Sequence, residues 1–326
     1  MISVKRYNAR TQKEWNALVT ISANGTFLLD RRFMEYHKDR FIDHSLLLYQ
    51  DNKLIALFPA NEKGEKIFSH AGLTYGGLIM TPATKLFTTL SCIYSLVKYY
   101  HQKGFKHIIY KPVPWFFHTT PYFGDLYALF LLGSTLTAFN TGFITDLALP
   151  ETVSKEGRYM IRKAGKYGVR VARARDCRTF WRDILVPHVT KRFGTKPVHT
   201  VEEIELLRNR FPKNILQYHA MIRDEIVAGV TIFLDRGVAH CQYIAGSDLA
   251  RKTGANDYLI WHLMTRTFKN LRFFSFGTAN MGSPDGRTLS RGLVAWKEGF
   301  GATMASYPCY DIETKNYRAL APYTYE

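Results

Sequence analysis

The chain has 326 residues, of which 46% are hydrophobic and 14% aromatic, enough for about two domains with buried cores. Lysine and arginine number 44 against 27 aspartates and glutamates, a formal net charge of +17. Such a balance indicates anionic partners: a phosphate-bearing cofactor, a nucleic acid or a lipid head group. The cysteines, Cys92, Cys177, Cys241 and Cys309, are far apart and form no C-x-x-C pair, which argues against a zinc site and a disulfide framework.

No segment has the apolar length of a signal-peptide core or a membrane-spanning helix. We therefore expect a cytoplasmic protein with reduced thiols. Peripheral contact of its basic surface with an anionic membrane stays open.

The first half of the chain alternates between strand and helix patterns. Residues 45–49 and 53–59 have the period-two pattern of strands, and Asp51-Asn52 between them predicts a hairpin turn. Residues 84–101 have apolar positions at helical spacing. Pro150 marks the expected end of a first domain.

A glycine-rich segment lies at residues 69–78. It contains three glycines, a histidine and a tyrosine, a composition that is costly to order unless a ligand binds there. We predict that His70, Thr74 and Tyr75 contact the substrate. The alternative is a structural turn around a buried His70.

The second half begins with a basic helix pattern at residues 154–166. Several of its basic residues fall on one face, Arg162 among them. That face is a candidate for phosphate contact, and the alternative is a solvated surface. A strand pattern at residues 169–174 and helix patterns at 180–193 and 201–210 follow.

The run R-K-T-G-A-N at residues 251–256 follows a strand pattern at 238–247 and begins a long helical pattern. A glycine at a strand-to-helix turn lets backbone N–H groups approach a phosphate, and a helix N-terminus adds partial positive charge. The predicted cofactor contacts are Arg251, Lys252, Gly254, Ala255 and Asn256.

This Arg-x-x-Gly-x-Asn run resembles the acyl-CoA pyrophosphate loop of the GNAT N-acyltransferase superfamily, with Asn256 in place of the usual glycine or alanine. Lys297-Glu298-Gly299-Phe300-Gly301, the basic run at residues 162–169 and the glycine-rich segment at 69–78 resemble the two-domain FemAB-like branch of that superfamily.

The resemblance implies an α/β fold of tandem GNAT-like domains, each with a mostly antiparallel twisted sheet flanked by helices. Residues 1–150 are expected to be the acceptor-side domain without a cofactor loop, and residues 151–326 the domain that carries it. The element order of residues 78–110 recurs at 244–276, which is a weak internal duplication and agrees with this architecture.

N-acyl transfer needs a neutral amine, donors for the oxyanion and a route for protons. The strand at residues 238–247 offers His240 as a base and Tyr243 as an acid. Regular alternation places these two on opposite faces, so they can act together only if the strand bulges. For each, a purely structural role is the alternative.

Further candidates lie near the C-terminal end. The resemblance makes Lys297 a catalytic candidate and Glu298 a substrate contact, with an exposed ion pair as the alternative. Ser275 and Asn280 lie at the exit of a strand, where open α/β sheets place ligands. They are predicted substrate contacts through position alone.

Together with these patterns, the resemblance implies an N-acyltransferase that uses acyl-CoA, most readily acetyl-CoA, and no metal. The expected acceptor is an amino group on a sugar or peptide of a cell-envelope precursor. One alternative is a Fem-type enzyme that takes its acyl group from aminoacyl-tRNA. Another is a non-catalytic protein that binds anionic glycan or lipid precursors.

Overall fold

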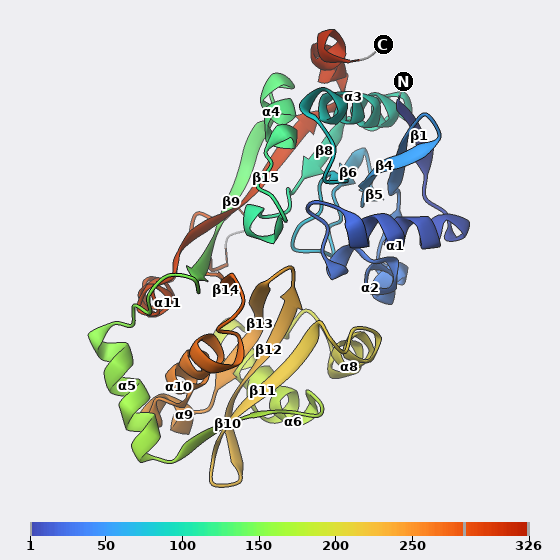
Figure 1. Cartoon of the computed structure of the whole chain (residues 1–326). Coiled ribbons are helices and arrows are strands. Elements are labelled where there is room, and N and C mark those ends of the chain that lie inside the picture. The colour runs from blue at the N-terminus through green and yellow to red at the C-terminus, as the bar shows by residue number, and fades with distance from the viewer. Residues whose placement is uncertain (1, 283–284, 325–326) are drawn as a thin grey trace. The chain divides into compact units, whose positions relative to one another are not determined.

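A computed structural model describes residues 2–282 and 285–324 of the chain. The chain forms two compact units, drawn in Figure 1. Unit 1 comprises Met1–Asn140, Gly282–Arg287 and Ser306–Glu326, and unit 2 comprises Thr141–Met281 and Thr288–Ala305.

The end of the chain lies in unit 1, whereas the sequence predicted two consecutive segments divided at residue 150. The reason is the last strand, β15 (Thr303–Glu313), whose final residues pair with β8 (His107–Tyr110) of unit 1.

Unit 1 contains strands from two sheets, with helices packed against them. The strands of the four-stranded sheet, in the order in which they lie side by side, are β1 (Ile2–Arg6), β3 (Leu46–Gln50), β4 (Lys53–Phe58) and β7 (Ile79–Met80). The other strands of this unit, in order, are β15, β8, β6 (Lys66–Phe68), β5 (Asn61–Lys63) and β2 (Ile42–Asp43). The α-helices are α1 (Gln12–Ile21), α2 (Arg31–Met34), α3 (Leu86–Gln102) and α4 (Gly124–Leu131). The 3-10 helices are η1 (Ala9–Thr11), η2 (Phe27–Leu29), η3 (Glu35–Arg40), η4 (Trp115–Phe117) and η7 (Thr314–Tyr323).

The hairpin predicted between β3 and β4 is confirmed. Asp51 and Asn52 have φ angles of 49° and 61°, the left-handed conformation that both central residues of a type I′ turn adopt.

Unit 2 is built on one twisted sheet. Its strands, in the order in which they lie side by side, are β10 (Val169–Arg173), β11 (Ile215–Ile222), β12 (Glu225–Asp235), β13 (Val238–Gly246), β14 (Phe273–Thr278) and, from Thr141 on, β9 (Thr135–Asp146). The α-helices are α5 (Lys155–Lys166), α6 (Arg178–Phe180), α7 (Val186–Phe193), α8 (Val201–Arg210), α9 (Asp248–Thr253), α10 (Ala255–His262) and α11 (Arg291–Glu298). Two π-helical turns are η5 (Trp181–Leu185) and η6 (Leu263–Thr267).

The two faces of this sheet are covered by different helices. Helix α10 lies across the strands on one face, with α5 packed beside it (Figure 1). Val230, Ile232 and Cys241 belong to the buried core of this face. On the opposite face, Trp181 of η5 packs edge-on against Tyr243 of β13, with ring centroids 4.8 Å apart.

Most strand pairs in both units are antiparallel. In the described part of the chain, the parallel pairs are β6 with β8 and β13 with β14. The predicted α/β class with mostly antiparallel sheets flanked by helices is confirmed.

Candidate active site

Strands β13 and β14 separate part-way along their length. They pair in parallel at Val238–Phe273, Ala239–Phe274 and His240–Ser275, and among the described residues the pairing ends there. Strand β13 nevertheless continues to Gly246, and β14 to Thr278. The two strands therefore splay apart beyond His240 and Ser275. Within the part of the chain that the structure describes, the backbone of β13 has no strand partner on that side of the splay.

Strand β13 also bulges against β12. Tyr243 pairs with Thr231 and His240 pairs with Phe233, so Gln242 is the extra residue. Thr231 and Phe233 are two residues apart and share a face, which places His240 and Tyr243 on that same face. The prediction that His240 and Tyr243 lie on opposite faces of the strand is therefore wrong. The strand contains the bulge that would allow the two residues to act together.

His240 is held next to β14. Its Nδ1 lies 2.9 Å from Oγ of the fully buried Ser275. Burial, and secondarily the Lys297 ammonium, lower the pKa of His240 to about 4. The imidazole is therefore neutral near pH 7, the state in which a histidine can accept a proton.

Lys297 of α11 is 2% exposed, so the alternative of an exposed ion pair with Glu298 is wrong. Its Nζ donates hydrogen bonds to the carbonyl oxygens of Gly277, at 2.9 Å, and Thr278, at 2.6 Å. Burial lowers its pKa to about 8. Glu298, the next residue, is exposed, because consecutive helix residues point in different directions.

Tyr243 has a partner that sequence patterns did not indicate. Its hydroxyl lies 2.6 Å from Nδ1 of His199, a buried residue just before α8. The two residues are 44 positions apart in the sequence, and no local motif links them.

A cavity of about 320 Å³ lies at the splayed end of β13. Residues from α5, α7, β13, α9, α10 and α11 line it: Met160, His188, Arg192, Ile244, Ala245, Gly246, Arg251, Asn256, Asp257, Gly292, Leu293 and Trp296. Asn256 contributes a polar atom, since its Oδ1 is buried and has no hydrogen-bond partner among the described residues.

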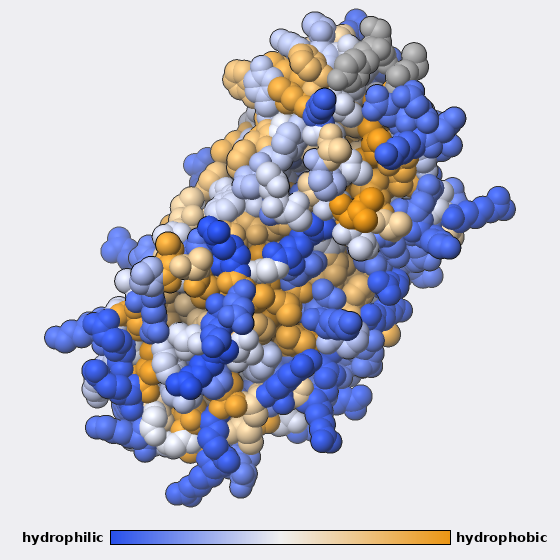
Figure 2. Space-filling model, viewed as in Figure 1, coloured by the Kyte–Doolittle hydropathy of each residue, from blue (hydrophilic) through white to orange (hydrophobic). Residues whose placement is uncertain are grey.

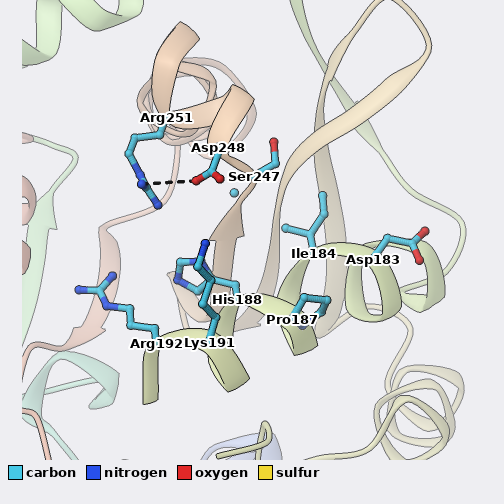
Figure 3. Close-up of a pocket in the computed structure, with 10 residues that line it drawn as sticks. Asp183, Ile184, Pro187, His188, Lys191, Arg192, Ser247, Asp248 and Arg251 are labelled. Carbon is cyan, nitrogen blue, oxygen red and sulfur yellow. Dashed lines mark ion pairs between the residues drawn. The ribbon is translucent and has the colours of Figure 1, made fainter. Parts of the chain in front are cut away.

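A second cavity of about 600 Å³ adjoins the first, and the two share His188, Arg192, Gly246 and Arg251. Figure 3 shows His188 and Lys191 extending from α7 toward Asp248 and Arg251 on α9. Asp248 forms an ion pair with Arg251 at 3.4 Å. The basic side chains from α7 and α9 make this cavity suited to an anionic group.

The predicted pyrophosphate loop has a different local structure. Arg251 and Lys252 lie within α9, and Gly254 ends that helix in the left-handed conformation, with φ +81°. The N–H of Gly254 donates to the carbonyl of Ala250, and a Cβ at Gly254 would overlap the carbonyl group of Met160 in α5. The N–H of Gly254 and its open side are therefore both used to join α9, α10 and α5, and a contact of Gly254 with a phosphate stays a prediction.

The other residues predicted to bind the cofactor at this loop differ in where their side chains lie. Arg251 and Asn256 line the cavities. Ala255 is fully buried, so it offers no side-chain surface to a ligand, and Lys252 is exposed.

Two further predicted contacts lie in unit 2. Asn280 Oδ1 accepts hydrogen bonds from the Thr141 N–H, at 2.7 Å, and the Thr141 hydroxyl, at 3.2 Å, which holds the start of the β9 segment in this unit. Arg162 is exposed on α5. A role in substrate binding stays a prediction for both.

The predicted contacts in unit 1 are mostly interior. His70 is 3% exposed with φ +62°, and burial, followed by the charges of His37, Lys111 and Arg31, lowers its pKa to about 3. Tyr75 is buried, with its hydroxyl 3.0 Å from Oγ1 of Thr26. Thr74 is exposed. The positions of His70 and Tyr75 fit the structural alternative for this segment.

Membrane spans and metal clusters are both missing from residues 2–282 and 285–324. No helix in these ranges is long and apolar enough to cross a membrane. No group of three or more histidine, cysteine, aspartate or glutamate side chains in the same ranges is placed to hold a metal ion.

Comparison with known families identifies unit 2. Residues 153–287 match the acetyltransferase (GNAT) domain model. This segment is a GNAT domain. The match spans α5 through β14 and so includes the bulged strand, the splay and the residues of the larger cavity.

Solved structures extend the likeness beyond the GNAT domain. FemX is 14% identical and superposes with a TM-score of 0.66 over 95% of this chain and 98% of its own. The C-terminal domain of a putative lysylphosphatidylglycerol synthetase from Agrobacterium fabrum is 12% identical, with a TM-score of 0.60 over 97% of this chain and 95% of its own. L-PGS from Bacillus licheniformis is 15% identical, with a TM-score of 0.57 over 97% of this chain and 94% of its own. No curated protein matches in sequence.

The chain thus has the two-domain, FemAB-like fold that the sequence resemblance implied. At these identities the likeness shows the fold. The chemistry of the GNAT domain has to be argued from its own residues.

Proposed function

We propose that this protein is an N-acyltransferase whose reaction takes place where β13 and β14 splay apart in the GNAT domain. The observation that carries the proposal is the splay itself, which opens beyond His240 and Ser275 beside a cavity of about 320 Å³. The amide groups of a donor's pantetheine arm laid along β13 can hydrogen-bond to backbone groups that pair with no described strand, as the resemblance to GNAT sites implies.

Two side chains at the splay supply the proton and charge chemistry. His240, neutral near pH 7, accepts the proton of the attacking amine. Lys297 has three N–H donors, and two are used by Gly277 and Thr278. The third is available for the oxyanion of the tetrahedral intermediate, whose charge the buried ammonium stabilises. The negative charge of that oxyanion offsets the ammonium charge and so raises the proton affinity of His240 as the amine attacks.

The proposed donor is an acyl-CoA. The residues that would hold its diphosphate are Lys191, Arg192 and Arg251, which line the larger cavity, rather than the N–H of Gly254. With the diphosphate bound there, the thioester can extend into the smaller cavity beside the splay, because the two cavities share lining residues. It would supply the activated acyl group at that point.

A second donor, aminoacyl-tRNA, is favoured by one specific observation. Helix α5 carries exposed bases, among them Lys155, Arg162 and Lys166, and Met160 of the same helix lines the smaller cavity. A basic helix at the edge of the acyl site is placed to contact the phosphates of an RNA acceptor arm. The overall likeness to FemX agrees with this alternative.

For the acceptor, we propose an amino group on a sugar or peptide of an anionic cell-envelope precursor. The net charge of +17 supports an anionic acceptor, and the FemAB-like fold supports an envelope precursor. Peripheral contact with an anionic membrane is consistent with the same charge.

The test compares acyl transfer by the wild type with transfer by Lys297→Met and His240→Gln, using acetyl-CoA or aminoacyl-tRNA and a panel of amines. We expect each substitution to lower kcat by about 10²-fold or more, the size of effect that general-base and oxyanion groups produce. Lys269→Met, which makes the same change at an exposed lysine of unit 2, is the matched control and should retain activity. No donor consumption by the wild type with any amine would instead favour a non-catalytic binding protein.

A further inference from the structure

Helix α4 of unit 1 is apolar on both of its faces. Ala128 and Leu129 are buried in the core of unit 1. Phe123, Tyr127 and Phe130 follow at spacings of four and three residues on the outer face, where they are 52%, 45% and 76% exposed. A surface helix normally presents polar residues outward. The outer face of α4 therefore lacks the polar side chains that are usual on a solvent-exposed helix face.

The apolar surface continues onto α3. Oγ1 of Thr89 lies 2.9 Å from the hydroxyl of Tyr122, so the first turn of α3 lies beside the start of α4. Leu86 and Phe87 in that turn are 39% and 52% exposed. Hydrophobic residues gather over α4 in Figure 2.

We call this surface the aromatic face. Its members are Leu86, Phe87, Phe123, Tyr127 and Phe130. The rings of Tyr127 and Phe130 stack with centroids 6.3 Å apart, which gives the outer side of α4 a continuous aromatic surface.

The charge around the aromatic face is one-sided. Residues 112–145 contain one acidic residue, Asp125, and no lysine or arginine; Asp125 is buried and accepts a hydrogen bond from the Tyr110 hydroxyl at 2.8 Å. At one end, the exposed Lys85 precedes α3. At the other, Asn316 Nδ2 donates to the carbonyl of Leu132, which brings η7 and its exposed Arg318 next to the end of α4.

We propose that the aromatic face docks on an anionic lipid bilayer. Aromatic side chains partition into the membrane interface, and flanking bases are attracted to anionic head groups. The arrangement of exposed aromatics with Lys85 and Arg318 at the two ends matches this partner in side-chain chemistry and in charge. A second copy of the chain fits less well, because two such faces would bring the same positive charges together. Docking does not require transfer activity, so a test of docking is independent of a test of the proposed function.

Docking is tested by co-sedimentation with phosphatidylcholine vesicles that contain either no phosphatidylglycerol or about 30% of it, a fraction that makes the vesicle surface negative. We expect the wild type to bind the anionic vesicles more tightly. The double variant Tyr127→Ser/Phe130→Ser should lower the partition coefficient at least about tenfold, since two apolar side chains leave the interface. Val198→Ser is the matched control, because Val198 is 75% exposed in unit 2 and should bind like the wild type.

A second measurement tests directly whether the aromatic face inserts into the bilayer. In a Phe130→Trp variant, lipids brominated near the head group should quench the added tryptophan fluorescence, whereas a Val198→Trp variant should show no added quenching. Equal vesicle binding by the wild type and the double variant, with no more quenching in Phe130→Trp than in Val198→Trp, would overturn the proposal. A wild-type dimer that the double variant converts to a monomer in analytical ultracentrifugation would assign the aromatic face to a second copy of the chain instead.

Discussion

The ammonium group of Lys297 is buried at the point where β13 and β14 separate, and two backbone carbonyls hold it there. A buried ammonium normally loses its charge more easily than an exposed one, and its pKa is lowered to about 8. Lys297 is therefore charged at neutral pH but titrates within an accessible range. This makes its role measurable.

We expect the alkaline limb of the pH profile to follow Lys297. Below pH 8 the ammonium is protonated and stabilises the oxyanion, so kcat/KM should fall as the pH rises through about 8. In Lys297→Arg, the guanidinium stays charged at every accessible pH, and the fall near pH 8 should disappear even if the overall rate is lower. Profiles between pH 6 and 10 with one acceptor check this, and an unchanged alkaline limb in Lys297→Arg would exclude Lys297 as its source.

His70 should make unit 1 sensitive to acid. Its pKa is about 3 in the folded protein and about 6.5 when unfolded, so the unfolded chain binds more protons between these values. The stability that the neutral His70 contributes to the folded protein is therefore fully present above pH 6.5 and is lost as the pH falls toward 3. We expect His70→Asn, which tolerates φ +62°, to lose less stability between pH 6.5 and 4 than the wild type in urea titrations. His101→Asn, a change at an exposed histidine, should follow the wild type.

At the scale of elements, the junction of α9, α10 and α5 replaces the loop that the sequence predicted. Gly254 ends α9 and admits the backbone of Met160, so α5 approaches α10 closely. The same junction places Asn256 and Met160 on the wall of the smaller cavity. The glycine thus shapes the wall of this cavity through helix packing.

Gly254→Ala should destabilise the protein by about 2 kcal/mol or more, because alanine is disfavoured at φ +81° and its Cβ overlaps Met160. Gly165→Ala on the outer side of α5 is the matched control. A Cβ there meets no atom within 4 Å, and the change should be neutral or stabilising by up to about 1 kcal/mol. Chemical denaturation measures both, and equal stabilities for the two variants would show that the close junction is not maintained in solution.

At the scale of the whole molecule, the charge of +17 fits either proposed donor, acyl-CoA or aminoacyl-tRNA. The salt dependence of binding distinguishes the two. RNA binding releases counterions and weakens with added salt in proportion to the phosphates contacted. A small diphosphate held by a few bases in a cavity should show a much smaller slope.

We expect the triple variant Lys155→Gln/Arg162→Gln/Lys166→Gln to discriminate between the donors. If aminoacyl-tRNA is the donor, the slope of log affinity against log salt should decrease by about one for each base removed. Affinity for acyl-CoA should remain unchanged, because these residues line neither cavity. Filter binding and titration calorimetry measure the two ligands, and an unchanged tRNA slope would remove α5 from the RNA interface.

The sequence by itself determined the element types and the fold class of this protein. Period-two strands, the Asp51-Asn52 turn and the helical spacing of α3 depend on local contacts and backbone preferences, which neighbouring residues decide. The short runs around residues 251–256 and 297–301 sufficed for the superfamily, and His240 and Lys297 were identified as candidates.

Only the tertiary structure decided how these residues meet. The bulge at Gln242 depends on the register with β12, and the contact of His199 with Tyr243 joins residues 44 positions apart. The role of Gly254 depends on α5, which comes roughly ninety residues earlier in the chain, and the return of β15 to unit 1 depends on its pairing with β8. Each of these is a long-range contact, and its energy comes from packing and register between segments that are distant in the sequence. Local sequence patterns therefore do not predict such contacts.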